Sequence, residues 1–352
     1  MRIRRSDDEE QGESDSDESS VSSGVGFQHR HHPDLPDEAF DESDTAQAFQ
    51  DQITIAFDSG KSISKVQQRE IIEDDAVQYT SPQAELLAWH YRLGHLSFAR
   101  IQKLVDRGDL PAYLRDVRRP RFASCMFGKA TRQPWRTKAP VNKQTVPPAS
   151  APGAVVGVDQ LTSSTPGLVR QMRGILTRKR YTVTTVFVDH FSGFSYIHLQ
   201  LSTSAAHTIE AKRAFEQCAA THGVTIKHYH ADNHIFDSKP FVDEVRLAGQ
   251  SISYCAVNAH HQNGRAEKRI RDLQELARTM LLHAKQRWPS AVTTNLWPYA
   301  IRMANDISNI TPILKLNEYV SPLEIFSQVN VKPKVKHTHT FGCPVYVLDD
   351  KP

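Results

Sequence analysis

Three stretches decide how this chain folds: AVVGVDQL (154–161), TIKHYHADN (225–233) and HQNGRAEKRIRDLQELARTML (261–281). The first two are apolar runs of strand type, and each leads into an aspartate, Asp159 or Asp232. The third has helical spacing, and Glu267 lies at the edge of its apolar stripe. Carboxylates from two strand ends and one helix can converge on a pair of Mg²⁺ ions that clamp the oxygens of a phosphodiester. The pattern therefore predicts a two-metal site for phosphoryl transfer.

Each acidic residue also has a structural explanation when it is taken alone. An aspartate at a strand end often caps a turn, and Glu267 stands four residues before Arg271, the spacing of a helix salt bridge. Asp189 also ends an apolar run, but the HFSGF turn that follows it predicts a role in holding a hairpin. The salt bridge does not account for Arg278, which lies on the same helix edge as Glu267. The combination of positions favours the metal site.

The order of the expected elements indicates an α/β domain. Three antiparallel strands followed by alternating helices and strands predict a mixed sheet with helices on its faces. The expected strands are 154–162, 181–189, 194–201, 225–231 and 251–255. The expected helices are 204–222, 239–248, the long one from 263, and 297–307. A further strand is expected in FGCPVYVL (341–348).

Charge is distributed very unevenly along the 352 residues. Residues 1–80 hold 20 Asp and Glu against 7 Lys and Arg, whereas residues 81–352 hold 36 Lys and Arg against 20 Asp and Glu. The acidic, Ser-rich region 1–81 is expected to be disordered because it lacks apolar residues to form a core. The basic remainder is suited to a polyanion such as DNA. Four scattered cysteines and no apolar run of membrane length predict an intracellular protein with no membrane partner.

A small helical unit precedes the α/β domain. Apolar residues at helical spacing in Glu85–Tyr91 and Phe98–Val105, separated by Gly94, predict two helices within 82–137. The Pro- and Ala-rich segment 138–151 is typical of a linker. The α/β domain is then expected over 152–312, followed by a C-terminal extension over 313–352.

The chain resembles the integrase of copia-type LTR retrotransposons. The resemblance lies in LLAWHYRLGHLSFARIQKLV (86–105), SCMFGK (124–129), the acidic stretches with NGRAEK, YVSPLEIF (319–326) and FGCPVYVL, and it spans about three quarters of the chain. It implies an RNase H-like core with a five-stranded mixed sheet, in which Asp159, Asp232 and Glu267 hold two Mg²⁺ or Mn²⁺ ions. In the family pattern Asn263 would cap the long helix, and Gly264 would permit a tight entry.

The same resemblance implies a zinc-binding unit before the core. His90, His95 and Cys125 match three of its four ligands, two histidines and two cysteines. Phe122 stands where the first cysteine is expected. Since structural zinc is four-coordinate, either Ser124, a water or another residue completes the site, or Phe122 fills it with apolar contacts and no zinc binds. His234 is a second departure, because it follows Asp232 and Asn233 where the family has glycine.

The implied function is DNA integration by 3′-end processing and strand transfer, carried by a fragment of a Pol polyprotein. DNA is the expected partner, both as retroelement ends and as target, with contacts from Asn263, Lys268, Arg271 and Arg278. A homo-multimer is implied, acting in a cytoplasmic particle and the nucleus, without a small-molecule substrate. The alternative is an inactive retroelement remnant that binds nucleic acid by charge alone. An RNA-cleaving nuclease is less favoured, because no hybrid-binding motif is present.

Overall fold

The computed structural model describes residues 79–120, 125, 128–129, 149–170, 177–232, 234–255, 263–315, 318–330 and 335–345. Most of the expected acidic region and most of the expected linker lie outside these residues, as does Phe122. No helix in the described part of the chain is long and apolar enough to cross a membrane.

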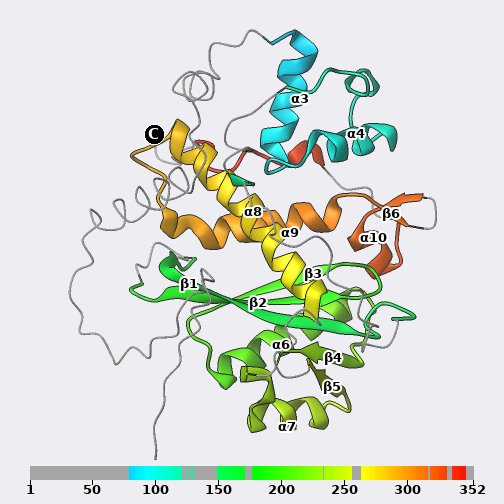
Figure 1. Cartoon of the computed structure of the whole chain (residues 1–352), viewed down its shortest axis with the longest axis vertical. Coiled ribbons are helices and arrows are strands. Elements are labelled where there is room, and N and C mark those ends of the chain that lie inside the picture. The colour runs from blue at the N-terminus through cyan, green and yellow to red at the C-terminus, as the bar shows by residue number, and fades with distance from the viewer. Residues whose placement is uncertain are drawn as a thin grey trace, which may run out of the picture. The chain divides into compact units, whose positions relative to one another are not determined.

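A five-stranded mixed sheet forms the centre of the α/β domain (Figure 1). Its strands are β1 (Val156–Leu168), β2 (Arg180–Asp189), β3 (Ser195–Gln200), β4 (His228–Ala231) and β5 (Ser251–Tyr254). They are arranged in the order β3-β2-β1-β4-β5. Strands β1, β2 and β3 pair antiparallel, whereas β4 is parallel to both β1 and β5. This is the sheet of the RNase H-like fold, and it confirms the expected mixed five-stranded sheet.

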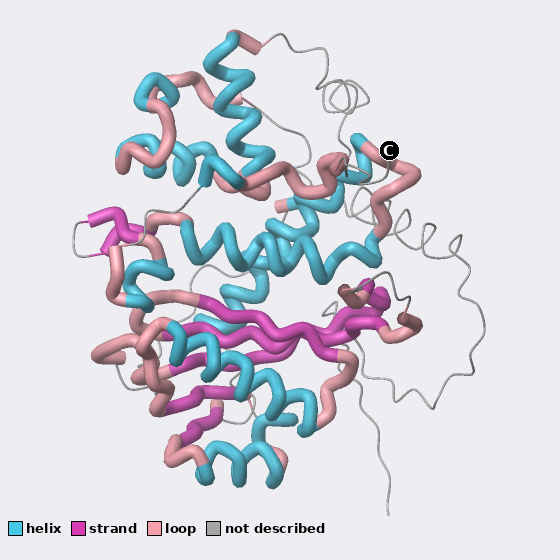
Figure 2. The backbone as a smooth tube through the Cα atoms, turned by 180° about the vertical axis from the view of Figure 1, so that it is seen from behind, coloured by secondary structure: helices cyan, strands magenta, loops and turns pink. Residues whose placement is uncertain are grey.

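Helices cover both faces of this sheet (Figure 2). On one face α6 (Ala205–Thr221) and α7 (Lys239–Leu247) bury an apolar cluster with β1 and β4. On the other face α8 (Gly264–Arg287) and α9 (Trp297–Ile310) bury a second cluster with β2. The two cores explain why β2 is fully buried from Val183 to Asp189, since both of its faces are covered there.

Strand β1 is longer than the sequence predicts. Its pairing with β2 shifts register between Thr162 and Gly167, and the strand then continues to Leu168. Trp297 holds this second part, because its Nε1 donates a hydrogen bond to the Thr165 carbonyl at 2.9 Å. A Cβ at Gly167 would lie 2.3 Å from Pro298 Cγ, so only glycine fits beneath α9. A bulge held by a distant tryptophan cannot be predicted from local periodicity.

The C-terminal extension also differs from the expectation. A small hairpin, β6 (Ile313–Lys315) with β7 (Glu318–Val320), and a short helix α10 (Pro322–Ser327) were not predicted. The expected strand in FGCPVYVL is wrong over the described residues 341–345, which form a turn and irregular backbone. Gly342 has a φ of +73°, which places it in the left-handed region and breaks an extended run.

The small helical unit consists of α3 (Ser81–Arg92), α4 (Phe98–Asp106) and a 3₁₀ turn at Ala112–Leu114. The two expected helices are therefore confirmed. The unit has its own apolar core, which also includes Ile307 of α9 and Val335. It is joined to the C-terminal extension by Arg107, whose guanidinium donates to both carboxylate oxygens of Glu324 at 3.0 and 3.2 Å.

Two glycines mark the closest approach of this unit to the core helices. A Cβ on Gly94 would lie 2.6 Å from Ile307 Cδ1 of α9. A Cβ on Gly128 would lie 2.2 Å from Thr279 Oγ1 and 2.9 Å from the Thr279 Cα of α8. The second contact is with backbone, which cannot swing away. The helical unit is thus packed directly on the α/β domain.

Replacing Gly128 with alanine should lower stability by about 1–3 kcal/mol, the usual cost of overpacking a tight contact. Thermal or denaturant unfolding of the full chain measures the effect. Gly264→Ala is the matched control, because a Cβ there meets no described atom within 4 Å and its φ is not positive. Equal stability of the two variants would show that the unit does not pack on α8 as described.

Candidate active site

The register of two parallel strands places Asp159 and Asp232 beside each other. Val158 of β1 is paired with Ala231 of β4, so the residues that follow them are neighbours. Val158 and Ala231 are fully buried in the cluster beneath α6. Since successive side chains of a strand point to opposite faces, Asp159 points toward the face that carries α8. Val186, the β2 partner of Asp159, is indeed buried in the cluster with α8.

Asn263 connects the start of α8 to β1. Its side-chain Nδ2 donates to the Val158 carbonyl at 3.0 Å, and only 2% of the residue is exposed. Asn263 occupies the expected N-cap position of α8, but its side chain makes no cap hydrogen bond to the helix and is bonded to the strand instead. Glu267 follows one helical turn later, is half-buried, and so lies over the part of β1 that carries Val158 and Asp159.

The three carboxylates all contribute to the electrostatic environment of the buried Cys255 thiol. Cys255 follows β5, is 3% exposed and receives a backbone hydrogen bond from Asn263. Its pKa is raised to about 11, first by burial and then by the negative charges of Asp232, Glu267 and Asp159. All three acids therefore act on one sulfur atom. No feature of the sequence singled out Cys255, because an isolated cysteine at a strand end has no pattern to identify it.

Asp189, the aspartate that the sequence assigned to the hairpin, has that role. Its Oδ1 accepts from the Gly153 amide at 2.8 Å, and its Oδ2 accepts from the Ser192 amide and hydroxyl at 2.7 and 2.6 Å. The residue is fully buried, and burial raises the pKa of its carboxyl above the usual value. The structural interpretation of Asp189 is confirmed, and its oxygens are occupied by the turn.

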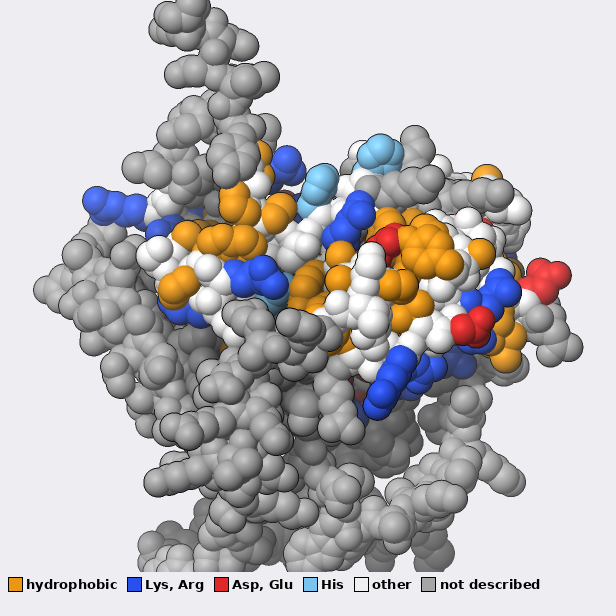
Figure 3. Space-filling model, turned by 90° about the horizontal axis from the view of Figure 1, so that it is seen from above, with side chains coloured by type: hydrophobic (Ala, Val, Ile, Leu, Met, Phe, Trp, Pro, Cys, Tyr) orange, Lys and Arg blue, Asp and Glu red, His pale blue; other side chains and the backbone are white. Residues whose placement is uncertain are grey.

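The expected DNA contacts divide into two groups. Lys268, Arg271 and Arg278 are exposed on α8, whereas Asn263 is buried and its side chain faces the sheet. Figure 3 looks onto the end of the molecule that carries α3 and α4, where Lys and Arg side chains are spread among apolar ones. His234 begins a 3₁₀ turn after β4, but its side chain lies outside the described part.

A second cluster lies where the helical unit meets α8. His90 Nε2 is 3.0 Å from Cys125 Sγ and 3.2 Å from His95 Nδ1, and Cys125 Sγ is 3.5 Å from the same His95 nitrogen. Among the described residues these three offer ligand atoms that all lie within 4.8 Å of one another. Zn–N bonds of about 2.0–2.1 Å and Zn–S bonds of about 2.3 Å give tetrahedral edges of about 3.3–3.6 Å. The triangle thus fits three ligands of a zinc ion.

Without a metal, burial keeps this cluster uncharged. It lowers the pKa of His90 to about 3 and that of His95 well below its usual value, and it raises the pKa of the Cys125 thiol to about 11. Lys129 nearby opposes protonation of both histidines and partly offsets the shift of the thiol. Neutral imidazoles are the form that binds a metal, whereas the thiol must lose its proton on binding.

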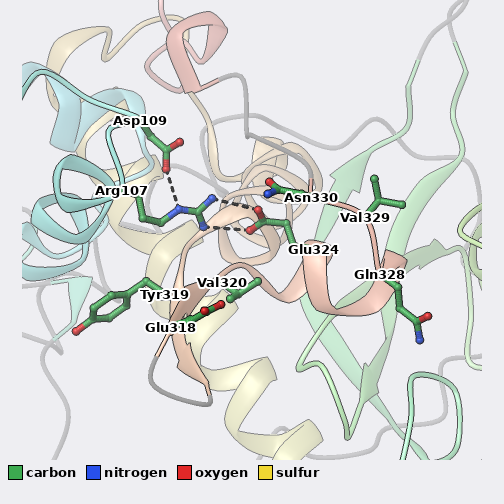
Figure 4. Close-up of a pocket in the computed structure, with 9 residues that line it drawn as sticks. All are labelled: Arg107, Asp109, Glu318, Tyr319, Val320, Glu324, Gln328, Val329 and Asn330. Carbon is green, nitrogen blue, oxygen red and sulfur yellow. Dashed lines mark hydrogen bonds and ion pairs between the residues drawn. The ribbon is translucent and has the colours of Figure 1, made fainter.

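A cavity of about 500 Å³ lies away from both clusters (Figure 4). Arg107 and Asp109 line it from the helical unit, and Glu318, Tyr319 and Glu324 line it from the C-terminal extension. The Arg107–Glu324 pair closes one side of it. None of the three candidate catalytic acids borders this cavity, so it belongs to the joint between the helical unit and the extension.

Sequence comparison finds relatives of the chain among transposon proteins. No family model matches the chain. The chain is 26% identical over 297 residues to the retrovirus-related Pol polyprotein from transposon RE2 of Arabidopsis thaliana, which covers 82% of this chain and 18% of that protein. It is 24% identical over 273 residues to the polyprotein from transposon RE1 of the same plant, with 76% and 16% covered. The chain thus spans less than a fifth of the length of these relatives.

Solved structures of retroviral integrases are also similar to the chain. A chain of the simian T-cell lymphotropic virus intasome in complex with the PP2A regulatory subunit B56 gamma matches with a TM-score of 0.40 and 13% identity, covering 61% of this chain and 65% of that one. The HTLV-2 integrase catalytic core domain in complex with magnesium (trimeric form) matches with a TM-score of 0.35 and 17% identity, covering 50% and 98%.

The sheet and its helices define a protein with the RNase H-like fold. The sequence relatives agree with the resemblance found in the motifs: the chain is similar to Pol polyproteins of retrotransposons, and an LTR retrotransposon integrase fits its sequence.

Converting Asp232 to asparagine or Glu267 to glutamine should lower the pKa of the Cys255 thiol, because each removes a negative charge that opposes thiolate formation. The pH dependence of Cys255 alkylation, followed by peptide mass spectrometry, measures this shift. Wild type should react slowly below about pH 11, and the variants should react at lower pH. Glu210→Gln on α6, beneath the other face of the sheet, is the control. An unchanged profile in both acid variants would contradict the convergence of the acids.

Proposed function

We propose that the chain is a retrotransposon integrase that processes the 3′ ends of element DNA and transfers them to target DNA. The observation that supports it most directly is the β1–β4 register, which places Asp159 beside Asp232, and the charges of both aspartates and Glu267 all raise the pKa of Cys255. Three carboxylates from two adjacent parallel strands and one helix are a donor set that suits Mg²⁺ or Mn²⁺. The relationship to transposon Pol polyproteins supports the same assignment.

Each acid has a distinct structural origin and hence a distinct role in the proposal. Asp159 and Asp232 are fixed by the β1–β4 register, so they set the spacing of the donor set. Glu267 is carried by α8 and is positioned through Asn263, whose bond to the Val158 carbonyl holds the helix start on β1. Held by these carboxylates, two divalent ions would activate the attacking oxygen and stabilise the leaving oxygen of a phosphodiester.

DNA is the proposed partner, both as element ends and as target. Residues 81–352 carry 36 Lys and Arg against 20 Asp and Glu, and α8 exposes Lys268, Arg271 and Arg278 along the helix that also carries Glu267. Such a row can follow a phosphate backbone that leads to the acids. In this proposal the protein acts as a homo-multimer on two DNA ends, in a cytoplasmic particle and in the nucleus.

The second candidate function is an inactive remnant that binds DNA by charge alone. It is favoured by Phe122, which replaces a cysteine of the expected zinc set. The acids do not share this defect, because all three are present, and the β1–β4 register supports a site in which Asp159 lies beside Asp232.

Strand transfer of a labelled DNA end in Mg²⁺ or Mn²⁺ separates the two functions. The wild-type chain should join the end to target DNA, and Asp232→Asn or Glu267→Gln should lower the rate by on the order of 10³-fold or more, the scale of removing one catalytic group. Glu210→Gln, the control on α6, should keep the wild-type rate. A wild-type chain that binds DNA but joins none under either metal would be the remnant.

DNA affinity should fall steeply with salt and should not depend on the acids. Each phosphate contact contributes about 0.9 to the slope of log K against log salt concentration. Replacing both Arg271 and Arg278 with glutamine should reduce that slope by about 2. Lys239→Gln on α7 is the charge control, and Asp232→Asn should bind at least as tightly as wild type. An unchanged salt slope in the double variant would show that α8 is not part of the DNA-binding surface.

A further inference from the structure

His283 brings the α/β core into the His/Cys cluster. It lies near the end of α8 and is 3% exposed. Its Nδ1 is 3.0 Å from Nε2 of His95, the nitrogen that faces away from His90 and Cys125. The two rings meet edge to face with centroids 4.8 Å apart. His283 therefore contacts His95 on the side away from Cys125 and His90. A hydrogen bond at this position fixes which nitrogen of His95 carries the proton.

Hydrogen bonds connect the rings of His283, His95 and His90 in a chain. The partners at the two ends of this chain determine which ring nitrogen donates in each bond. Arg287 Nε donates to His283 Nε2 at 2.8 Å, so a neutral His283 carries its proton on Nδ1 and donates it to His95. His95 then carries its proton on Nδ1 and donates to His90 Nε2. His90 donates from Nδ1 to the Leu96 carbonyl at 2.8 Å. In the metal-free protein every ring is thus neutral and satisfied.

When a metal is bound, the hydrogen bond between His95 and His283 must reverse, with His95 as the donor. His90 already presents a bare Nε2, but His95 must move its proton from Nδ1 to Nε2 before Nδ1 can be a ligand. That Nε2–H then donates to His283 Nδ1, so His283 carries its proton on Nε2 and no longer accepts from Arg287. No histidine gains or loses a proton overall, and the single proton released to solvent is that of the Cys125 thiol.

We propose that His283 is a positioning residue of a zinc site formed by His90, His95 and Cys125, and that its bond to Arg287 opposes metal binding. The inference rests on the His90, His95 and Cys125 cluster of the integrase that we propose, and extends it to a residue of the core helix. His283 supplies the acceptor that turns Nδ1 of His95 toward the metal. Arg287 is exposed and lies over the Tyr91 ring at 5.4 Å, so it can withdraw when the cluster is loaded.

The test is the zinc affinity of the full chain, measured by competition with a chromophoric chelator. His283→Leu removes the acceptor and should weaken binding about 10–100-fold, the usual effect of losing such a partner. His283→Gln keeps an oxygen that can accept from His95 and should bind more tightly than the leucine variant. Arg287→Met removes the opposing donor and should bind zinc more tightly than wild type. Lys285→Met, which removes the same charge from the same helix end, should leave affinity unchanged.

A second readout follows the ring protons directly. In ¹⁵N NMR of the histidine rings, the proton of His283 should move from Nδ1 to Nε2 when zinc is added, a change that a purely structural role would not produce. If wild type binds no zinc, the metal cluster fails and this inference fails with it. If wild type binds zinc but Arg287→Met and Lys285→Met behave alike and the His283 tautomer stays fixed, only the inference is overturned. If His283→Leu does not fold, the zinc affinity of Arg287→Met relative to Lys285→Met still tests the inference.

Discussion

The parallel register of β1 and β4 is the constraint on which the candidate active site depends. With Val158 opposite Ala231, Asp159 within β1 and Asp232 just after β4 are adjacent and share the face beneath α8. A shift of one residue in either strand would turn one carboxylate to the opposite face. The register is fixed because Val158 and Ala231 are fully buried under α6, so slippage would expose core side chains. The apolar packing on one face of the sheet thus fixes the positions of the two carboxylates on the other face.

Helix α8 extends this constraint across the molecule. Asn263 fixes its first residues to β1, Glu267 lies one turn later, and His283 lies about 24 Å further on at 1.5 Å per residue. Two faces of α8 are buried: the sheet covers one, and the helical unit covers the other at Thr279 and His283. The candidate catalytic acid and the candidate metal cluster are therefore connected by one continuous element rather than by a flexible linker.

Much of the core could be predicted from the sequence because its signals are local. Apolar runs of strand length predicted β2, β3, β4 and β5 within three residues and the start of β1 within two, and the turn after Asp189 distinguished this aspartate from the candidate acids. The contacts that were missed come from distant parts of the chain. Thr279 and His283 are polar residues that local periodicity places on a solvated helix face, yet the helical unit buries them. Likewise, the role of Asn263 depends on a strand 105 residues earlier in the chain.

The replacement at Phe122 bears on metal affinity more than on the fold. The helical unit has an apolar core of its own, and Leu86, Ile101, Leu104 and Leu114 are each at most 1% exposed. Burial of one such side chain contributes about 1.5–3 kcal/mol, and the unit gains further contacts with α9 and the C-terminal extension. A domain stabilised in this way does not need a closed four-ligand zinc site to fold. An incomplete ligand set in the helical unit is therefore physically compatible with an intact set of acids in the core, since the two sites are held by different interactions.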